Sequence, residues 1–144
     1  MKHKAKMGAL VGAATLSVAA LATPNAEAAS RTAHYQIGTK CYADVYVHTN
    51  NTGPDVEAFF GIFCEGRGSV MVTPWIGLRK NGHANGNPRS PGLRIVDEGH
   101  GLTYSVAKKN DSGKQCYQGI LSMDFPAGPE IPHHKTIKTP CLNV

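Results

Sequence analysis

The spacing of the four cysteines constrains the fold of this 144-residue chain more than any other feature. They form two pairs, and the midpoint of each pair falls at or beside a Gly-Pro step. In an antiparallel hairpin, facing residues share a constant sum of residue numbers, because the two strands run in opposite directions. The spacing therefore predicts two disulfide-linked hairpins, with the bonds Cys41–Cys64 and Cys116–Cys141.

Residues 1–28 have the composition of a secretion signal peptide. Three lysines among the first six residues precede a mostly apolar, uncharged run over 8–22, and Ala26-Glu27-Ala28 supplies a small-x-small cleavage pattern. The apolar run is too short to cross a bilayer as a stable helix, and no later run is longer. We therefore expect export of a single extracellular domain, 29–144, with no membrane span.

The cysteine content agrees with an oxidising compartment. All four cysteines follow the expected cleavage site, and none has the Cys-x-x-Cys spacing of a zinc ribbon or a thioredoxin-like protein. An even number of cysteines in a short secreted chain favours disulfides over metal ligands and catalytic thiols. We expect each bond to contribute about 3 kcal/mol to the free energy of unfolding.

The charge of the chain gives no indication of a nucleic-acid partner. After residue 28, twelve Lys and Arg residues oppose nine Asp and Glu residues, and the basic residues are spread along the chain. A nucleic-acid-binding surface usually shows a denser basic patch. We therefore expect an ordinary soluble surface and no nucleic acid.

Alternating apolar residues and frequent Gly and Pro predict an all-β fold. Val, Ile, Tyr, Phe and Thr fill the segments between turns, which is typical of a small antiparallel β-sandwich of about seven strands. With two disulfides, the pattern resembles small secreted immunoglobulin-like sandwiches of bacteria, although no motif of a particular family is present. The expected strands are 34–48, 56–64, 69–79, 93–97, 102–109, 114–124 and 135–141.

The first cysteine hairpin can be tested against its own sequence. With Cys41 opposite Cys64, one face becomes wholly apolar, as a buried sheet face should be. The register also places His48 opposite Glu57. A turn at 65–68 would continue the sheet with Cys64 opposite Ser69, which places Trp75 in the core. On the other face, the facing aromatic pairs are Tyr42 with Phe63 and Tyr46 with Phe59.

The second cysteine hairpin is less regular. Its register sets Ile120 opposite Ile137 but Ser122 opposite Lys135. The connecting segment 125–132 contains three prolines, which lack the N–H donor that a sheet requires. We therefore expect a long loop here and a final strand at a sheet edge. A turn at 110–113 predicts a further hairpin.

The four aromatic residues Tyr42, Tyr46, Phe59 and Phe63 form a candidate platform. If solvent reached them, their rings could stack a sugar ring or contact an apolar partner. The alternative is that this face is a second buried face, covered by another part of the chain. Strand 56–64 is apolar on both faces, which favours the buried alternative.

The histidines show no metal signature. Six histidines follow residue 28, and none has the spacing of a tight ligand set. His34 and His48 share one face of the expected strand 34–48, but an extended chain places them more than about 40 Å apart. We therefore predict no metal ion and no cofactor, while a site assembled from distant histidines stays open as an alternative.

The segment 81–92 is a candidate binding loop, because its Gly, Asn and Pro content excludes a regular element. The candidate residues are His83, Pro88, Arg89 and Ser90. In a proteinase inhibitor, Arg89 would enter the specificity pocket of a trypsin-like enzyme. A plain connection is the alternative, since no predicted disulfide braces this loop.

No residue is predicted to be catalytic. The sequence has no Gly-x-Ser-x-Gly motif, and no spacing singles out a carboxylate pair. We therefore expect a non-enzymatic secreted protein that binds an extracellular protein or polysaccharide through loops 81–92 and 125–134, with a proteinase inhibitor as one form. The alternatives are a small extracellular hydrolase, either metal-dependent or using His and carboxylate groups, and a structural protein without a discrete site.

Overall fold

The computed structural model describes residues 29–49, 55–126 and 132–144. The expected secretion signal at 1–28 lies outside the described residues, as do parts of the loops at 50–54 and 127–131. Where the chain is described, it forms strands and no helix, so no helix there could cross a membrane. The ten strands are β1 (Ser30–Ile37), β2 (Cys41–Thr49), β3 (Asp55–Cys64), β4 (Ser69–Lys80), β5 (His83–Ala84), β6 (Arg94–Asp97), β7 (Leu102–Lys109), β8 (Cys116–Asp124), β9 (His134–Lys138) and β10 (Leu142–Asn143).

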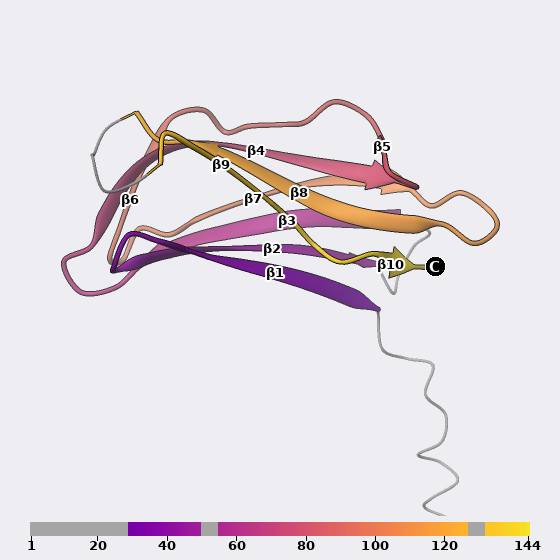
Figure 1. Cartoon of the computed structure of the whole chain (residues 1–144), viewed down its shortest axis with the longest axis horizontal. Helices are drawn as coiled ribbons and strands as arrows, with labels where there is room; N and C mark the ends of the chain where they lie inside the picture. The colour runs from indigo at the N-terminus through magenta and orange to yellow at the C-terminus, as the bar shows by residue number, and fades with distance from the viewer. Residues whose placement is uncertain (1–28, 50–54, 127–131) are drawn as a thin grey trace, which may run out of the picture.

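The strands form two antiparallel sheets, which lie as two layers in Figure 1. The first sheet has the order β1-β2-β3-β7. The second sheet has the order β10-β8-β4-β5, with β6 also paired to β4 and β9 also paired to β8. The all-β, sandwich-like prediction is therefore confirmed, but with ten strands instead of about seven. Both predicted disulfides, Cys41–Cys64 and Cys116–Cys141, are formed.

The predicted register of the first cysteine hairpin is confirmed along its whole length. Cys41 faces Cys64 with a Cα–Cα distance of 4.0 Å, and the same alignment continues to the pair His48 and Glu57. From Cys41 to Val47 each inward residue of β2 is buried, and each outward residue is partly exposed. A slip of one residue would turn every apolar side chain to the solvent, which explains why the sequence fixes this register.

The expected single strand 34–48 is wrong, because the chain turns back within it. Gly38 has a φ of 62°, a conformation that glycine adopts without steric cost, and it starts the turn between β1 and β2. β1 and β2 then pair with each other, with Ser30 opposite His48. His34 lies four residues from Ser30 along β1, so it is about 14 Å from the level of His48 and not 40 Å.

The core lies between the two sheets, where inward-facing apolar residues of β2 and β3 meet those of β4 and β8. Gly119 of β8 lies close to the first sheet, because a Cβ atom there would lie 3.0 Å from the Tyr46 carbonyl oxygen and 3.3 Å from Ala58 Cβ. Any larger residue at this position would force neighbouring atoms of the first sheet to shift. The largest fully buried side chains include Tyr117, Phe60, Phe125, Ile37, Ile62, Ile76 and Leu121.

The predicted hairpin between the strands at 56–64 and 69–79 is wrong. β3 already has β2 on one side and β7 on the other, so the chain crosses to the second sheet after residue 64. Trp75 was expected in the core, but it is 42% exposed, while its neighbour Ile76 is buried. The even-numbered positions of β4 are all apolar between Val70 and Leu78, and burying that set turns the odd-numbered positions outward.

The turn at 110–113 does not form the predicted hairpin either. It carries the chain from β7 in the first sheet to β8 in the second. The two crossings, β3 to β4 and β7 to β8, close the sandwich over the core. Sequence reasoning recognised both turns but assigned each to a single sheet, because local turn chemistry is the same in both cases.

The predicted register of the second cysteine hairpin is wrong by one residue. Leu121, and not Ile120, faces Ile137, and Leu121 is buried in the core. Between β9 and β10 the register shifts by one further residue, so that Leu142 faces Tyr117. The Cys116–Cys141 bond forms across this offset, with a Cα–Cα distance of 5.4 Å. As expected, the final segments lie at a sheet edge, since β9 and β10 pair only with β8.

Candidate functional site

The predicted aromatic ladder lies on the outer face of the first sheet. The rings of Tyr46 and Phe59 are stacked across β2 and β3, with centroids 4.6 Å apart and an interplanar angle of 12°. The rings of Tyr42 and Phe63 lie 5.7 Å apart and are tilted by 37°. We call these four residues the aromatic face. Its rings are held by a rigid pair of strands, so their spacing is fixed before any partner arrives.

The aromatic face is partly open to solvent. Tyr42, Tyr46 and Phe59 are half-buried, and Phe63 is 37% exposed. The inward residues of the same strands are fully buried, so the two faces of this sheet differ sharply. The expectation that another part of the chain buries this face therefore does not describe its geometry. Neighbouring rings shield part of one another from solvent, and the rest of each ring surface stays accessible.

Two glycines make room for the Phe63 ring. A Cβ atom on Gly61 would lie 2.5 Å from Phe63 Cε2, and one on Gly101 would lie 2.7 Å from Phe63 Cδ1. The ring therefore lies over backbone at both positions and stays low on the sheet. Glycine within a strand often marks such a close approach. The signal was readable in the sequence, although sequence reasoning did not use it.

Two histidine–carboxylate pairs adjoin the aromatic face, one level with Asp44 between the two ring pairs and one at the end beyond Tyr46 and Phe59. His34 Nδ1 lies 2.6 Å from Asp44 Oδ1, and the His34 ring is 5.8 Å from the Tyr42 ring. His48 Nε2 lies 3.4 Å from Glu57 Oε2, and the His48 ring meets Phe59 edge-on at 5.5 Å. The face therefore combines apolar ring surface with hydrogen-bonding groups at its borders. That combination suits a ligand with both apolar and hydroxyl-rich surface.

Tyr46 is chemically distinct on this face. Burial, with further contributions from the charge of Asp44 and from Tyr42, raises the pKa of the Tyr46 phenol above its ordinary value. The phenol therefore stays protonated and able to donate a hydrogen bond throughout the neutral and mildly alkaline range.

An open groove of 530 Å³ adjoins the aromatic face along β7. On one side it is bordered by Phe59 and the His48–Glu57 pair. On the other side Arg89 closes it, and its guanidinium carbon lies 6.0 Å from the Tyr104 ring centroid. Between them the floor carries the β7 hydroxyl groups of Thr103 and Ser105. The groove thus joins the aromatic face to the loop 81–92.

The candidate loop 81–92 is held against the second sheet along part of its length. The segment that joins β5 to β6 runs back along β4 (Figure 1), and the backbone N–H and C=O of Arg89 both bond to Ile76 at 2.8 Å. His83 lies in β5, so the prediction that this segment has no regular element is wrong at that point. Pro88 lies beside Gly77, and the Ser90 hydroxyl accepts a hydrogen bond from Gly92 at 3.0 Å.

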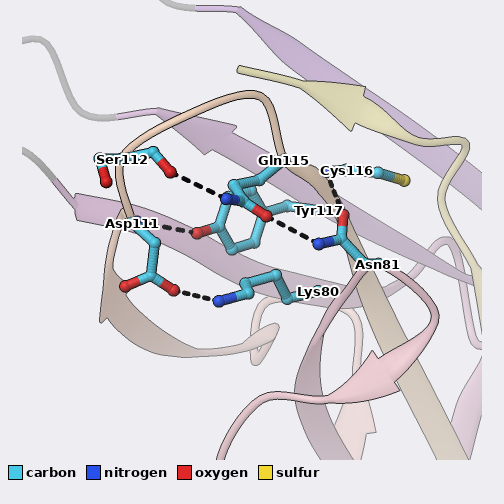
Figure 2. A network of polar contacts seen from close by, with 7 residues as sticks. All are labelled: Lys80, Asn81, Asp111, Ser112, Gln115, Cys116 and Tyr117. Atoms are coloured by element: carbon cyan, nitrogen blue, oxygen red, sulfur yellow. Dashed lines mark hydrogen bonds and ion pairs between the residues drawn. The ribbon is translucent and has the colours of Figure 1, made fainter.

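A polar network holds the start of this loop, as Figure 2 shows. Asn81 has a φ of 51°, unusual for a residue other than glycine. Its side-chain oxygen accepts from the Cys116 N–H at 2.9 Å, and its amide donates to Gln115 at 2.7 Å. Lys80 and Asp111 form an ion pair beside them. The network joins the β4–β5 turn to the β7–β8 connection, and its role is structural.

Four carboxylates that could serve in a hydrolase do not converge on one site. The carboxylates of Asp44, Asp97 and Asp124 each pair with a different histidine on separate parts of the fold, and Glu98 lies exposed in a turn. In the part of the chain that the structure describes, no group of three or more His, Cys, Asp or Glu side chains could hold a metal ion.

No family model matches the sequence, and no curated protein matches it either.

Proposed function

We propose that this is a secreted binding protein that takes a sugar polymer on the aromatic face of its first sheet. The observation that carries the proposal is the pair of cross-strand ring contacts, Tyr46 with Phe59 and Tyr42 with Phe63, on a partly open sheet face. One face of a pyranose ring presents C–H groups that pack on aromatic rings, while its hydroxyl groups seek hydrogen-bonding partners. Tyrosine serves both needs, because it joins an apolar ring to a polar hydroxyl.

The groove along β7 would extend the site beyond the rings. Thr103 and Ser105 offer hydroxyl groups there, and Arg89 and the His48–Glu57 pair offer charged partners at its walls. A polymer lying across β2, β3 and β7 could contact the rings and then this groove. The proposal moves the binding surface from the loops to a sheet face, and it keeps loop 81–92 as one wall.

A proteinase inhibitor is less well supported by the geometry. A bound inhibitor pairs its backbone with the protease around the specificity residue. In this protein the backbone N–H and C=O of Arg89 are both bonded to Ile76 within the chain. Those groups would have to leave the second sheet before a protease could engage them. The proposed partner is therefore a sugar polymer and not a protease.

An immunoglobulin-like arrangement is part of the proposal. In that fold, strands A, B and E share one sheet and strands C, F and G share the other. The neighbours β2-β3-β7 and the neighbours β4-β8-β9 have the corresponding order, with β6 beside β4 as a C′-like strand. The disulfides differ from the antibody pattern, because each joins neighbouring segments within one sheet. Two disulfides also support an extracellular location.

The test is retention of the oxidised domain 29–144 on cellulose, chitin and xylan, followed by affinity electrophoresis on the polymer that retains it. Phe59→Ala and Tyr46→Ala should each weaken binding about tenfold, which corresponds to about 1.4 kcal/mol. Trp75→Ala is the matched control, because Trp75 is an exposed aromatic residue on the outer face of the other sheet. Failure to bind any polymer, or equal weakening by Trp75→Ala, would refute the proposal.

A further inference from the structure

Four polar side chains form a continuous hydrogen-bonded chain on the outer face of the second sheet. Asp124 and Ser122 lie on β8, opposite His134 and Thr136 on β9. His134 Nδ1 lies 2.6 Å from Asp124 Oδ1, and His134 Nε2 lies 3.0 Å from Thr136 Oγ1. The Thr136 hydroxyl in turn lies 3.0 Å from the Ser122 hydroxyl. A carboxylate, an imidazole and a hydroxyl in this order have the connectivity of an acid–base–nucleophile triad.

One arrangement of protons satisfies every bond in the chain. The Asp124 carboxylate accepts from His134 Nδ1–H, which leaves a lone pair on Nε2. Nε2 then accepts from the Thr136 hydroxyl, whose oxygen accepts from the Ser122 hydroxyl. This tautomer is assigned from the bonding network. The Thr136 proton therefore points at a base, and Ser122 supports the oxygen that would lose it.

This pair differs from the other histidine–carboxylate pairs of the described residues. His34 with Asp44, His48 with Glu57, and His100 with Asp97 each end at the carboxylate, and none continues through hydrogen bonds to a hydroxyl group. Surface pairs of this kind are common on sheets and indicate nothing by themselves. The continuation to two hydroxyl groups is what singles out His134.

An apolar hollow of 280 Å³ begins beside the hydroxyl groups. Ser122 lines it, together with Trp75, Pro88 and Ile120. Trp75 faces Ser122 across β4 and β8, and Ser122 faces Thr136 across β8 and β9, so the three residues form one row. An acyl chain or an aromatic acyl group could lie against Trp75 while its carbonyl carbon reaches the hydroxyl groups.

We propose that this row is an acyl-transfer site for esters with a small apolar or aromatic acyl group, independent of the aromatic face. Thr136 Oγ1 attacks the ester carbonyl carbon, and its proton passes to His134 Nε2. The carbon–oxygen bond to the leaving alcohol then breaks, and His134 returns the proton to that oxygen. Water, deprotonated in the same way, attacks the acyl-Thr136 ester, releases the carboxylic acid and restores the hydroxyl. Asp124 holds the imidazole in the required tautomer and stabilises its charge.

The same geometry sets a low rate. Thr136 lies inside a regular strand, so the described residues offer no turn here that would direct several backbone N–H groups at one oxyanion. Two cationic side chains belong to this region: Lys138 is two residues along β9 from Thr136, and Arg79 lines the hollow. Loss of one oxyanion donor typically lowers kcat about 10²–10³-fold. His134 and Asp124 are also more than half exposed, which weakens their mutual attraction.

The test is acylation of the oxidised domain by p-nitrophenyl benzoate, with nitrophenolate release followed by absorbance and the adduct located by peptide mass mapping. The benzoyl group should be found on Thr136. Thr136→Val keeps the β-branched shape and should abolish that adduct, while His134→Gln should slow its formation about 10²-fold. Ser122→Ala should slow it less, because Ser122 only supports the nucleophile. Any pH dependence of the initial rate that arises from the base should disappear in His134→Gln.

His100→Gln is the matched control, since His100 has the same kind of bond to a carboxylate, that of Asp97, but no hydroxyl partner among the described residues. It should leave the rate and the adduct unchanged. The proposal is overturned if no adduct forms on Thr136, if lysines or tyrosines alone are acylated, or if His100→Gln and His134→Gln act equally. Thermal unfolding of each variant separates a local loss from unfolding. Sugar-polymer binding should be unaffected, so this proposal and the previous one fail separately.

Discussion

The two sheets of this protein share a core but present different outer faces. On the first sheet, the outward aromatic residues meet one another across neighbouring strands, as in the stacked pair Tyr46 and Phe59. On the second sheet, the outward Trp75 faces the polar Ser122. Ile95 of β6 faces Met71 and is 61% exposed, the highest fraction among the exposed large hydrophobic residues. Exposure of apolar residues alone therefore does not distinguish the faces. Their cross-strand neighbours do.

The comparison shows how one strand pattern serves two purposes. Both sheets alternate inward and outward residues, and both keep the inward set apolar. The outward set is free of that constraint, so it can carry either a row of rings or a hydrogen-bonded chain such as Asp124 to Ser122. Binding surfaces on sheets are thus decided by which outward residues the register places side by side.

The largest effect should come from the disulfides, one in each sheet. Their sequence separations are 23 and 25 residues, so loop entropy predicts an equal loss of about 3 kcal/mol in unfolding free energy for either paired substitution by Ala. Urea unfolding of Cys41→Ala/Cys64→Ala and of Cys116→Ala/Cys141→Ala measures both. A difference above about 1 kcal/mol between the two losses would show that strain or residual structure, and not loop length, determines the contribution of one disulfide.

Glycine substitutions separate the inner and outer surfaces. Gly119→Ala should lower stability by about 1–3 kcal/mol, because its Cβ atom would press on the Tyr46 carbonyl oxygen and on Ala58 where the sheets meet. Gly61→Ala is the control on the outer face, where the displaced group is the Phe63 side chain, which can move into solvent. Thermal unfolding should show the smaller loss for Gly61→Ala. Equal losses would contradict the assignment of Phe63 to an open face.

The two sheets also build their first turns differently. The β1–β2 turn relies on Gly38, whereas the β4–β5 turn uses Asn81 and its side-chain bonds. Asn81→Ala loses those bonds and keeps an unfavourable positive φ, so it should cost about 1–2 kcal/mol. Asn81→Gly loses only the bonds and should cost less. If the two variants were equally stable in chemical denaturation, backbone strain would contribute nothing at this turn.

The smallest effect concerns the titration of Tyr46. Its pKa is raised above 10.0 chiefly by burial, so the folded protein keeps this proton longer than the unfolded chain does. The resulting stability is present below pH 10 and is lost as the pH rises through the folded pKa. Ionisation of Tyr46 at high pH should therefore lower the free energy of unfolding. Absorbance titration of the tyrosines should lose one component in Tyr46→Phe, and Asp44→Asn should shift that component to lower pH.

Sequence reasoning identified the aromatic face but not its accessibility. The register of Cys41 with Cys64 was sufficient to place Tyr42 opposite Phe63, because the hairpin is local and one face must be apolar. Whether another layer would cover those rings depended on where the remaining strands pack. The hydrogen-bonded row from Asp124 to Ser122 was missed for a related reason. The predicted register was off by one residue and placed Ser122 opposite Lys135, whereas Ser122 faces Thr136.

The pairing of β2 with β3, the turns at 65–68 and 110–113 and both cysteine bonds were determined by the sequence, because each follows from neighbouring residues and from the alternation of apolar side chains. The tertiary structure alone decided that β4 and β8 leave the first sheet and that Trp75 points outward. It also set the offset at the second disulfide. These choices depend on filling a shared core between two sheets, a constraint that involves residues far apart in the chain and leaves no local pattern.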